Sequence, residues 1–168
     1  MEVNKINTCC FIGHRKINVT DGLVCHLEGI IESLIVTEKV DTFLFGSRSE
    51  FNELCLNSVT NLKKKYPHIK RIYVRAEFPY IDDTYKSYLL EQYEDTYYPE
   101  RIKNAGKAIY IERNREMIDN SSYCITYYIP HRRTAGIKGD TECKYVSGTE
   151  YAYYYAQKKG ITVFNVTE

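Results

Sequence analysis

The sequence predicts an α/β fold, namely a Rossmann-like three-layer sandwich in which helices flank a mainly parallel central sheet of about five strands. Short apolar segments that suit buried strands alternate along the chain with longer segments whose apolar residues recur at helical spacing. Glycine or proline directly follows several of the apolar segments and ends them. Such alternation is typical of a parallel sheet with both faces covered, and we expect residues 1–168 to form one domain.

The first half of the chain contains three expected strands, at residues 7–12, 42–45 and 70–75. The first expected helix has Thr20 as its N-cap and runs to about residue 37, because its leucines and isoleucines recur every three or four positions. The second expected helix follows Gly46 and ends before Pro67. Strand and helix therefore alternate regularly in this half.

The regular alternation is interrupted at about residues 76–106, which are rich in tyrosine and carry two prolines, and we interpret this segment as an insertion in the domain. The elements expected beyond it are a helix around 113–119, a strand at 123–129, a helix from about 148 to 159 and a closing strand at 161–164. Pro130 ends the first of these strands, and Gly160 suits the left-handed residue that ends many helices.

The chain has 17 tyrosines and no tryptophan. One group is expected on strands, where aromatic side chains pack well: Tyr73, Tyr110, Tyr127 and Tyr128. A second group lies in the insertion: Tyr80, Tyr85, Tyr88, Tyr93, Tyr97 and Tyr98. The second group either packs the insertion against the sheet or a second subunit, which we favour, or stacks on a ligand base or forms a lid.

The formal net charge of +1 indicates no general affinity for nucleic acid or for acidic membranes. The N-terminal residues lack the pattern of a signal peptide, and no apolar run approaches the ~20 residues that span a bilayer. We therefore expect a cytoplasmic protein whose partner is neither a membrane nor a nucleic acid. A homodimer formed through a helix face is an assembly that this fold allows.

The six cysteines are scattered along the chain, and none forms a Cys-x-x-Cys pair. Spacing of that kind would be needed for a typical zinc or redox site. We interpret the cysteines as reduced, structural thiols. The sequence accordingly predicts neither a metal nor a cofactor.

Glycine-containing loops follow the expected strands and predict a ligand site. In a parallel sheet, ligands bind beyond the carboxyl ends of the strands where the strand order reverses. If the first strand is central and the strand at 123–129 lies beside it, this position falls between Gly13-His14-Arg15 and the 130–149 loop. Gly46-Ser47-Arg48 should flank it. Backbone N–H groups and cations would then meet at one edge, which suits an anionic, nucleotide-like ligand.

Each residue of the first loop also has a simpler interpretation. Gly13 relieves backbone strain at the strand end or lets a ligand approach the main chain closely. His14 binds the ligand or makes a hydrogen bond that holds the loop in place. Arg15 binds the ligand or forms a surface salt bridge. Two donors directly after a strand end favour ligand contact.

Two segments, Ser47 to Glu50 and Ser147 to Glu150, share the Ser-x-x-Glu signature of a capping box at a helix start. Capping alone accounts for these serines and glutamates, but it does not account for Gly148 and Thr149. A capped helix still presents its first free amides to an anion. We therefore include Ser147, Gly148 and Thr149 in the predicted site.

Arg113 and Asn114 precede the strand at 123–129 and complete the predicted site. The simpler interpretation leaves the arginines solvated, with Met117 in the core on the same helix face as Arg113 and Asp119 as a turn or cap residue. His131, Arg132 and Arg133 open the loop nearest the predicted site and are either further ligand contacts or mobile surface charge.

Four motifs together resemble the SLOG superfamily, the Rossmann-like group that includes DprA/Smf and the LOG cytokinin-activating enzymes. The motifs are Cys10 to Arg15, Phe45-Gly46 followed by Glu50 to Cys55, Arg113 to Asp119, and Ser147 to Thr149. The chain resembles the bacterial YspA/YpsA-like branch most. The resemblance implies a modified Rossmann fold that binds nucleotides or nucleotide-derived small molecules near the first strand and the glycine–threonine loop.

Some members of the superfamily split the N-glycosidic bond of nucleoside monophosphates, and others sense nucleotide signals. The hydrolytic branch carries Pro-Gly-Gly-x-Gly-Thr-x-x-Glu, but here only Gly148-Thr149 remains and Ala152 stands at the glutamate position. This departure favours binding or sensing over catalysis. The alternatives are a phosphoribohydrolase that uses Glu50, Glu53 or Asp119, and a regulatory scaffold whose pocket is vestigial.

Overall fold

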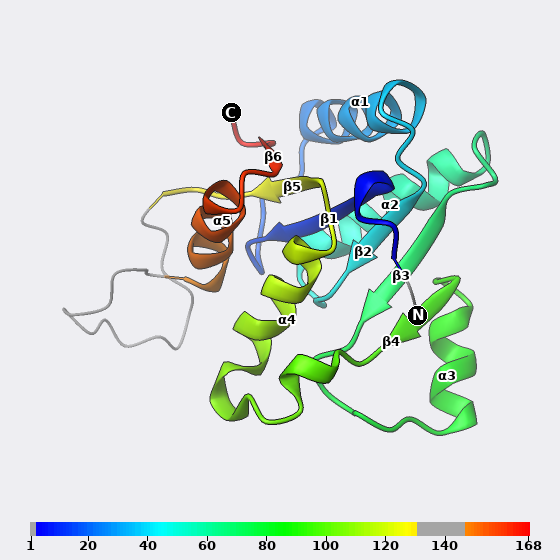
Figure 1. Ribbon diagram of the computed structural model, residues 1–168. Helices are drawn as coiled ribbons and strands as arrows, with labels where there is room; N and C mark the ends of the chain where they lie inside the picture. The colour runs from blue at the N-terminus through cyan, green and yellow to red at the C-terminus, as the bar shows by residue number, and fades with distance from the viewer. Residues whose placement is uncertain (1–2, 131–146) are drawn as a thin grey trace.

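The computed structural model describes residues 3–130 and 147–168. These residues form a six-stranded, entirely parallel sheet with the order β4-β3-β2-β1-β5-β6 (Figure 1). The strands are β1 (Thr8–Gly13), β2 (Thr42–Phe45), β3 (Lys70–Val74), β4 (Asp95–Tyr97), β5 (Tyr123–Tyr127) and β6 (Thr162–Asn165). The strand order reverses between β1 and β5, which pair directly, as the sequence predicts.

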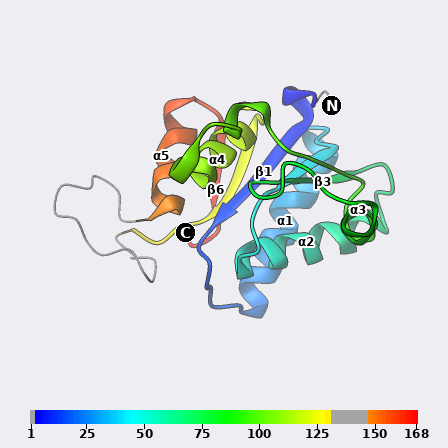
Figure 2. The same ribbon diagram turned by 90° about the horizontal axis from the view of Figure 1, so that it is seen from below.

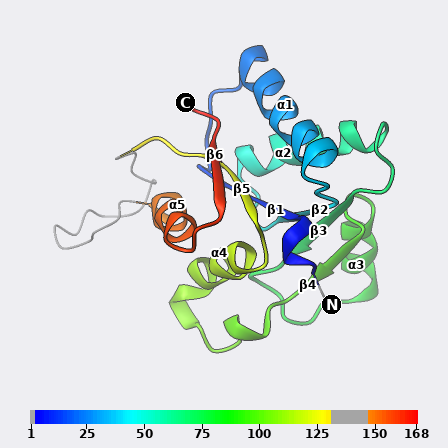
Figure 3. The same cartoon turned by 45° about the horizontal axis from the view of Figure 1, so that its top comes forward.

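The described helices cover both faces of this sheet. They are α1 (Asp21–Thr37), α2 (Glu50–Lys63), α3 (Asp83–Leu90), α4 (Ile109–Asp119) and α5 (Gly148–Lys158), with short 3-10 helices η1 (Lys5–Asn7), η2 (Glu100–Ile102) and η3 (Gly106–Ala108). Helices α1 and α2 lie on one face, and α4 and α5 lie on the other (Figures 2 and 3). The predicted three-layer, Rossmann-like sandwich is confirmed.

Strand β1 lies between two hydrophobic cores because both of its faces are covered. Cys9 and Phe11 pack in the core under α1 and α2, whereas Cys10 and Ile12 pack in the core under α4 and α5. All four side chains are buried. A strand buried on both faces is apolar at every position, and this is why an unbroken apolar run marks it in the sequence.

The number of strands differs from the prediction, because the segment at 76–106 contributes β4 to the sheet edge. Only three residues pair, with Thr96 opposite Tyr73 and Tyr97 opposite Val74. A strand this short shows no alternation of apolar and polar residues, so its sequence does not reveal it. Tyr93 is buried against the rings of Phe45 and Tyr73, whereas Tyr80 is 88% exposed. Some tyrosines of this segment therefore pack against the sheet, whereas others are exposed to solvent.

Two of the expected helix caps are confirmed, and one is wrong. Thr20 and Ser147 accept hydrogen bonds from the third amide of α1 and α5, each at 3.1 Å. Helix α2 begins two residues later than expected: its N-cap is Ser49, which accepts from the Asn52 amide at 3.1 Å. The Ser47 hydroxyl lies 2.9 Å from that of Ser49 and supports the cap from outside the helix.

Ser49→Ala is expected to lower the free energy of unfolding by about 1 kcal/mol, because it leaves the Asn52 amide without its acceptor. Ser47→Ala should cost less, since Ser47 contacts the cap but does not form it. Urea unfolding of both variants measures the difference. A larger loss for Ser47→Ala would show that Ser47 is the cap.

Tyr110 was expected on a strand but lies in the first turn of α4, where its side chain is 49% exposed. The apolar residues around it, Ile109 and Ile111, gave the segment the composition of a strand. Tyr73 and Tyr127 do lie on strands, and Tyr128 directly follows β5. No helix among the described residues is both long and apolar enough to cross a membrane.

Candidate functional site

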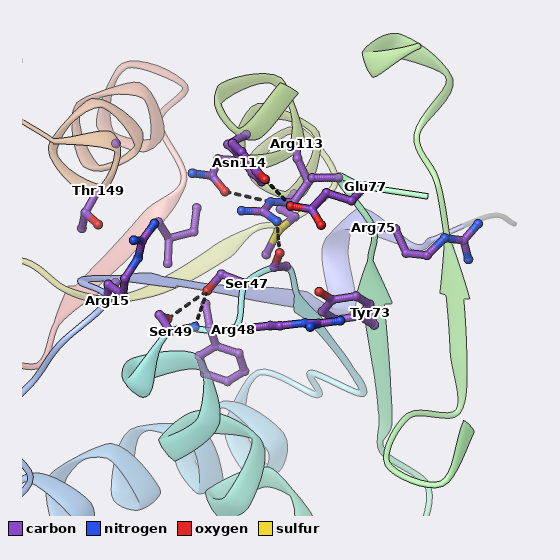
Figure 4. A pocket seen from close by; sticks show the side chains of 18 of the residues that line it. Arg15, Ser47, Arg48, Ser49, Tyr73, Arg75, Glu77, Arg113, Asn114 and Thr149 are labelled. Carbon is purple, nitrogen blue, oxygen red and sulfur yellow. Dashed lines mark hydrogen bonds between the residues drawn. The ribbon is translucent and has the colours of Figure 1, made fainter. Parts of the chain in front are cut away.

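A cavity of about 580 Å³ lies at the carboxyl edge of the sheet, at the predicted position. The sequence-predicted residues that line it are Gly13, Arg15, Gly46, Ser47, Arg113, Asn114, Gly148 and Thr149. They come from the ends of β1 and β2, from α4 and from the start of α5 (Figure 4). The structure therefore brings segments far apart in the chain around one space, and its volume lies within the range of small-molecule sites.

His14 and Ser147 are the predicted site residues that do not line this cavity. His14 is buried, and its Nε2 accepts a hydrogen bond from the Ile129 amide at 3.0 Å. Its own amide donates to the Tyr127 carbonyl, so His14 joins the loop after β1 to the end of β5. Ser147 is buried as the N-cap of α5. Both residues hold the loops that carry their neighbours into the cavity.

Close packing requires two of the three glycines of the predicted site, Gly13 and Gly46. A Cβ at Gly13 would lie 2.2 Å from Cδ1 of Phe51, and one at Gly46 would lie 2.5 Å from Sδ of Met117. Neither glycine has a positive φ, so the expectation that Gly13 relieves backbone strain is wrong. The chain needs glycine there because α2 and α4 pass directly against the strand ends.

Arg113 is the buried cation of the site, with 6% of its surface exposed. Its Nη1 donates to the Gly46 carbonyl, and its Nε donates to Oδ1 of Asn114 at 3.2 Å. No carboxylate of the described residues lies within ion-pair distance of it. Burial lowers the pKa of its guanidinium, yet an arginine stays charged at neutral pH. The expectation of a solvated side chain is thus wrong for Arg113.

Arg15 and Thr149 form one end of the cavity (Figure 4). Arg15 is exposed and makes no ion pair with a described carboxylate, so the salt-bridge interpretation is not supported. The backbone amides of Gly148 and Thr149 donate no hydrogen bond to a described residue. These two amides are the first of α5, where the helix dipole favours negative charge.

The rest of the cavity is lined by residues outside the predicted site, among which only Tyr85 was considered as a possible ligand contact: Tyr73, Arg75, Glu77, Phe78, Tyr85 and Tyr110. Arg48, which the sequence placed only near the site, also lines the cavity and donates to the Tyr85 hydroxyl at 3.0 Å. Arg75 and Glu77 follow β3 just as Arg15 follows β1. The strand-end rule, applied to the third strand as it was to the first, would have identified them.

The described lining residues include four arginines, and Glu77 is the only acidic side chain among them. The cavity thus has a strong excess of positive charge, to which the start of α5 adds. Aromatic rings and exposed backbone amides complete the lining. Such a surface can bind a flat ring and an anionic group at the same time.

The carboxylates considered for a hydrolase lie outside the cavity. Glu50 accepts a hydrogen bond from the Ile17 amide at 2.8 Å, Glu53 is exposed on α2, and Asp119 is paired with Arg101 at 2.7 Å. Ala152 is 1% exposed and packs in the core under α5, so the position of the motif glutamate faces the sheet.

His131, Arg132 and Arg133 lie outside the described residues. A scan against protein-family models finds no match for this chain, and a search of curated proteins finds no match either. The fold and the cavity define a Rossmann-like α/β protein with a cationic site at the topological switch point of its sheet.

Proposed function

We propose that this protein binds or senses a nucleotide or a nucleotide-derived small molecule in the cavity at the carboxyl edge of its sheet. The observation that carries the proposal is the shared cavity itself, which collects residues from the ends of β1 and β2, from α4 and from α5. Its excess of arginine suits an anion, and its aromatic residues suit a base.

The phosphate is assigned to the end formed by Arg15, Gly148 and Thr149. The two free amides of α5 supply directed donors, the Thr149 hydroxyl is a third, and Arg15 supplies a charge that no described carboxylate neutralises. Arg113 adds a charge from the cavity wall, where its burial strengthens the attraction to an anion.

The base is assigned to the opposite end, beside Tyr73 and Tyr85. Both rings line the cavity, and Arg48 is fixed there by its bond to the Tyr85 hydroxyl. Membership of the SLOG superfamily is part of the same proposal, since the motifs that carry the resemblance supply most of the predicted lining residues. The described cysteines are all free, which suits the reducing cytoplasm that we propose as its location.

A panel of nucleoside mono- and diphosphates tests the proposal by thermal shift of the purified protein. At a ligand concentration a hundredfold above Kd, binding stabilises the folded state by about 2.7 kcal/mol, which gives a clear rise in Tm. Failure of every nucleotide to raise Tm would contradict the proposal and favour a scaffold with a vestigial pocket.

Arg15→Gln is expected to weaken binding of the nucleotide that the panel identifies by about tenfold, because it removes one charged hydrogen bond to phosphate. Lys16→Gln is the matched control: it removes the same charge from the next exposed residue, which does not line the cavity. Titration calorimetry compares the two. Equal losses would mean that only the general charge of the surface matters.

A further inference from the structure

We infer that Glu77 selects a ligand with free ribose hydroxyls, so that the site accepts ribonucleotides in preference to deoxyribonucleotides. The inference rests on the proposed function and deepens it, because it names the substrate class. It starts from a feature that phosphate binding leaves unexplained. Among the described residues that line the cavity, Glu77 is the only acidic one, and it faces the same space as four arginines.

Glu77 is held with one carboxylate oxygen engaged and the other available. Its Oε1 accepts a hydrogen bond from the Tyr110 hydroxyl. Its Oε2 accepts none from a described residue, and the side chain is exposed to the cavity. Tyr110 also lies under the Arg113 guanidinium, 5.6 Å from the ring centre. Tyr110 is thus a positioning residue that joins the carboxylate to the buried cation.

The charge of Glu77 restricts which part of a nucleotide it can contact. A carboxylate repels phosphate and accepts hydrogen bonds only, so it requires a group on the ligand that donates. Paired ribose hydroxyls are such donors, and a hydrogen bond to a charged acceptor is worth more than one to a neutral acceptor. Loss of these hydroxyls would leave the carboxylate in the occupied site without a partner.

The position of Glu77 selects the ribose among the donors of a nucleotide. In the view of Figure 4, its carboxylate lies between the end formed by Arg15 and Thr149 and the ring of Tyr73. Ribose is the middle part of a nucleotide, between phosphate and base. In this view, the order of the side chains matches the order of the chemical groups along the ligand.

Titration calorimetry with matched ligands tests the inference. The probes are the 5′-monophosphates of adenosine, guanosine, cytidine and uridine, each with its 2′-deoxy and 2′,3′-dideoxy counterpart. We expect the wild-type protein to bind the preferred ribonucleotide about tenfold more tightly than its deoxy form. The preference should fall in Glu77→Gln, which keeps the shape but removes the charge, and disappear in Glu77→Ala. Affinity for the dideoxy ligand should not fall in either variant.

Glu53→Gln is the control, because Glu53 is exposed on α2 outside the cavity and its variant should keep the full preference. Tm measurements confirm that each variant is folded. If ribo- and deoxyribonucleotides bind the wild-type protein equally, or if Glu77→Ala keeps the preference, the inference fails while the proposed function stands. If no nucleotide binds, both fail.

Discussion

Gly13→Ala is expected to lower the free energy of unfolding by about 3 kcal/mol, the upper part of the range for overpacked cores. The added Cβ would lie 2.2 Å from Cδ1, 2.6 Å from Cγ and 2.9 Å from Cβ of Phe51. Phe51 lies in the first turn of α2 and is fully buried, so its ring cannot rotate away into solvent. Relief requires a shift of α2 away from the sheet. Urea unfolding, with the midpoint and slope compared to wild type, measures the loss.

Gly29→Ala is the matched control for this substitution. A Cβ at Gly29 meets no atom within 4 Å, and the residue lies in the interior of α1. Alanine in a helix is more favourable than glycine by about 0.5–1 kcal/mol, so this variant should be more stable than wild type. The same substitution, glycine to alanine, is thus expected to lower the free energy of unfolding at position 13 and to raise it at position 29.

The double variant Gly13→Ala/Phe51→Leu identifies the cause of the expected loss. Leucine removes the ring that the new methyl group would meet, so the double variant should lose less than the sum of the two single losses. Strictly additive losses in the free energy of unfolding, or a Gly13→Ala variant as stable as wild type, would contradict this prediction. Either result would show that the ring of Phe51 does not clash with a methyl group at the end of β1.

The layout of the sheet was predictable because its central strands are buried on both faces. Residues such as Phe11 and Phe43 are enclosed, so their segments read as unbroken apolar runs that end at a polar or glycine residue. Strand β4 has only one neighbour and three residues, and its pairing with β3 depends on the sheet already being formed. No local pattern in Asp95 to Tyr97 reports that pairing.

The site was predictable where its residues end a strand or follow it closely, since topology alone brings strand ends together. Gly13, Arg15 and Gly46 are of this kind, and all line the cavity. The partners of individual side chains were not predictable. The role of His14 depends on the Ile129 amide, which lies 115 positions away in the chain. Likewise, the hydroxyl that holds Glu77 comes from Tyr110, on a helix start that resembles a strand in composition.

Arg113→Met is expected to weaken nucleotide binding by about 100-fold while changing the free energy of unfolding by only about 1 kcal/mol. Removal of a buried charge that contacts an anion costs far more than removal of an exposed one, so the loss should exceed that of Arg15→Gln. Stability should change little because two effects oppose each other. The Gly46 carbonyl loses its donor, but the cost of burying a guanidinium without a carboxylate partner disappears.

This separation of binding from stability distinguishes a functional arginine from a structural one. A large loss of stability with intact nucleotide affinity would show that Arg113 serves only to join α4 to the end of β2. Circular dichroism during urea unfolding and titration calorimetry provide the two measurements. Ile118→Leu, a change of similar volume in the core on the same helix but outside the cavity lining, is the control and should leave nucleotide affinity unchanged.

Arg113→Lys should make nucleotide binding depend on pH, and this tests the environment of the cation directly. Burial lowers the pKa of the Arg113 guanidinium, but it stays protonated between pH 7 and pH 9, so the wild-type affinity should be nearly constant there. A lysine ammonium has an ordinary pKa of about 10.4, and burial lowers it by several units. The variant therefore carries its charge at the lower pH and loses it as the pH rises. The ligand phosphate, whose second pKa is about 6, stays doubly charged throughout. We expect Arg113→Lys to bind nucleotide more weakly at pH 9 than at pH 7 by about tenfold or more, whereas equal affinities at both pH values would place this cation in contact with bulk water.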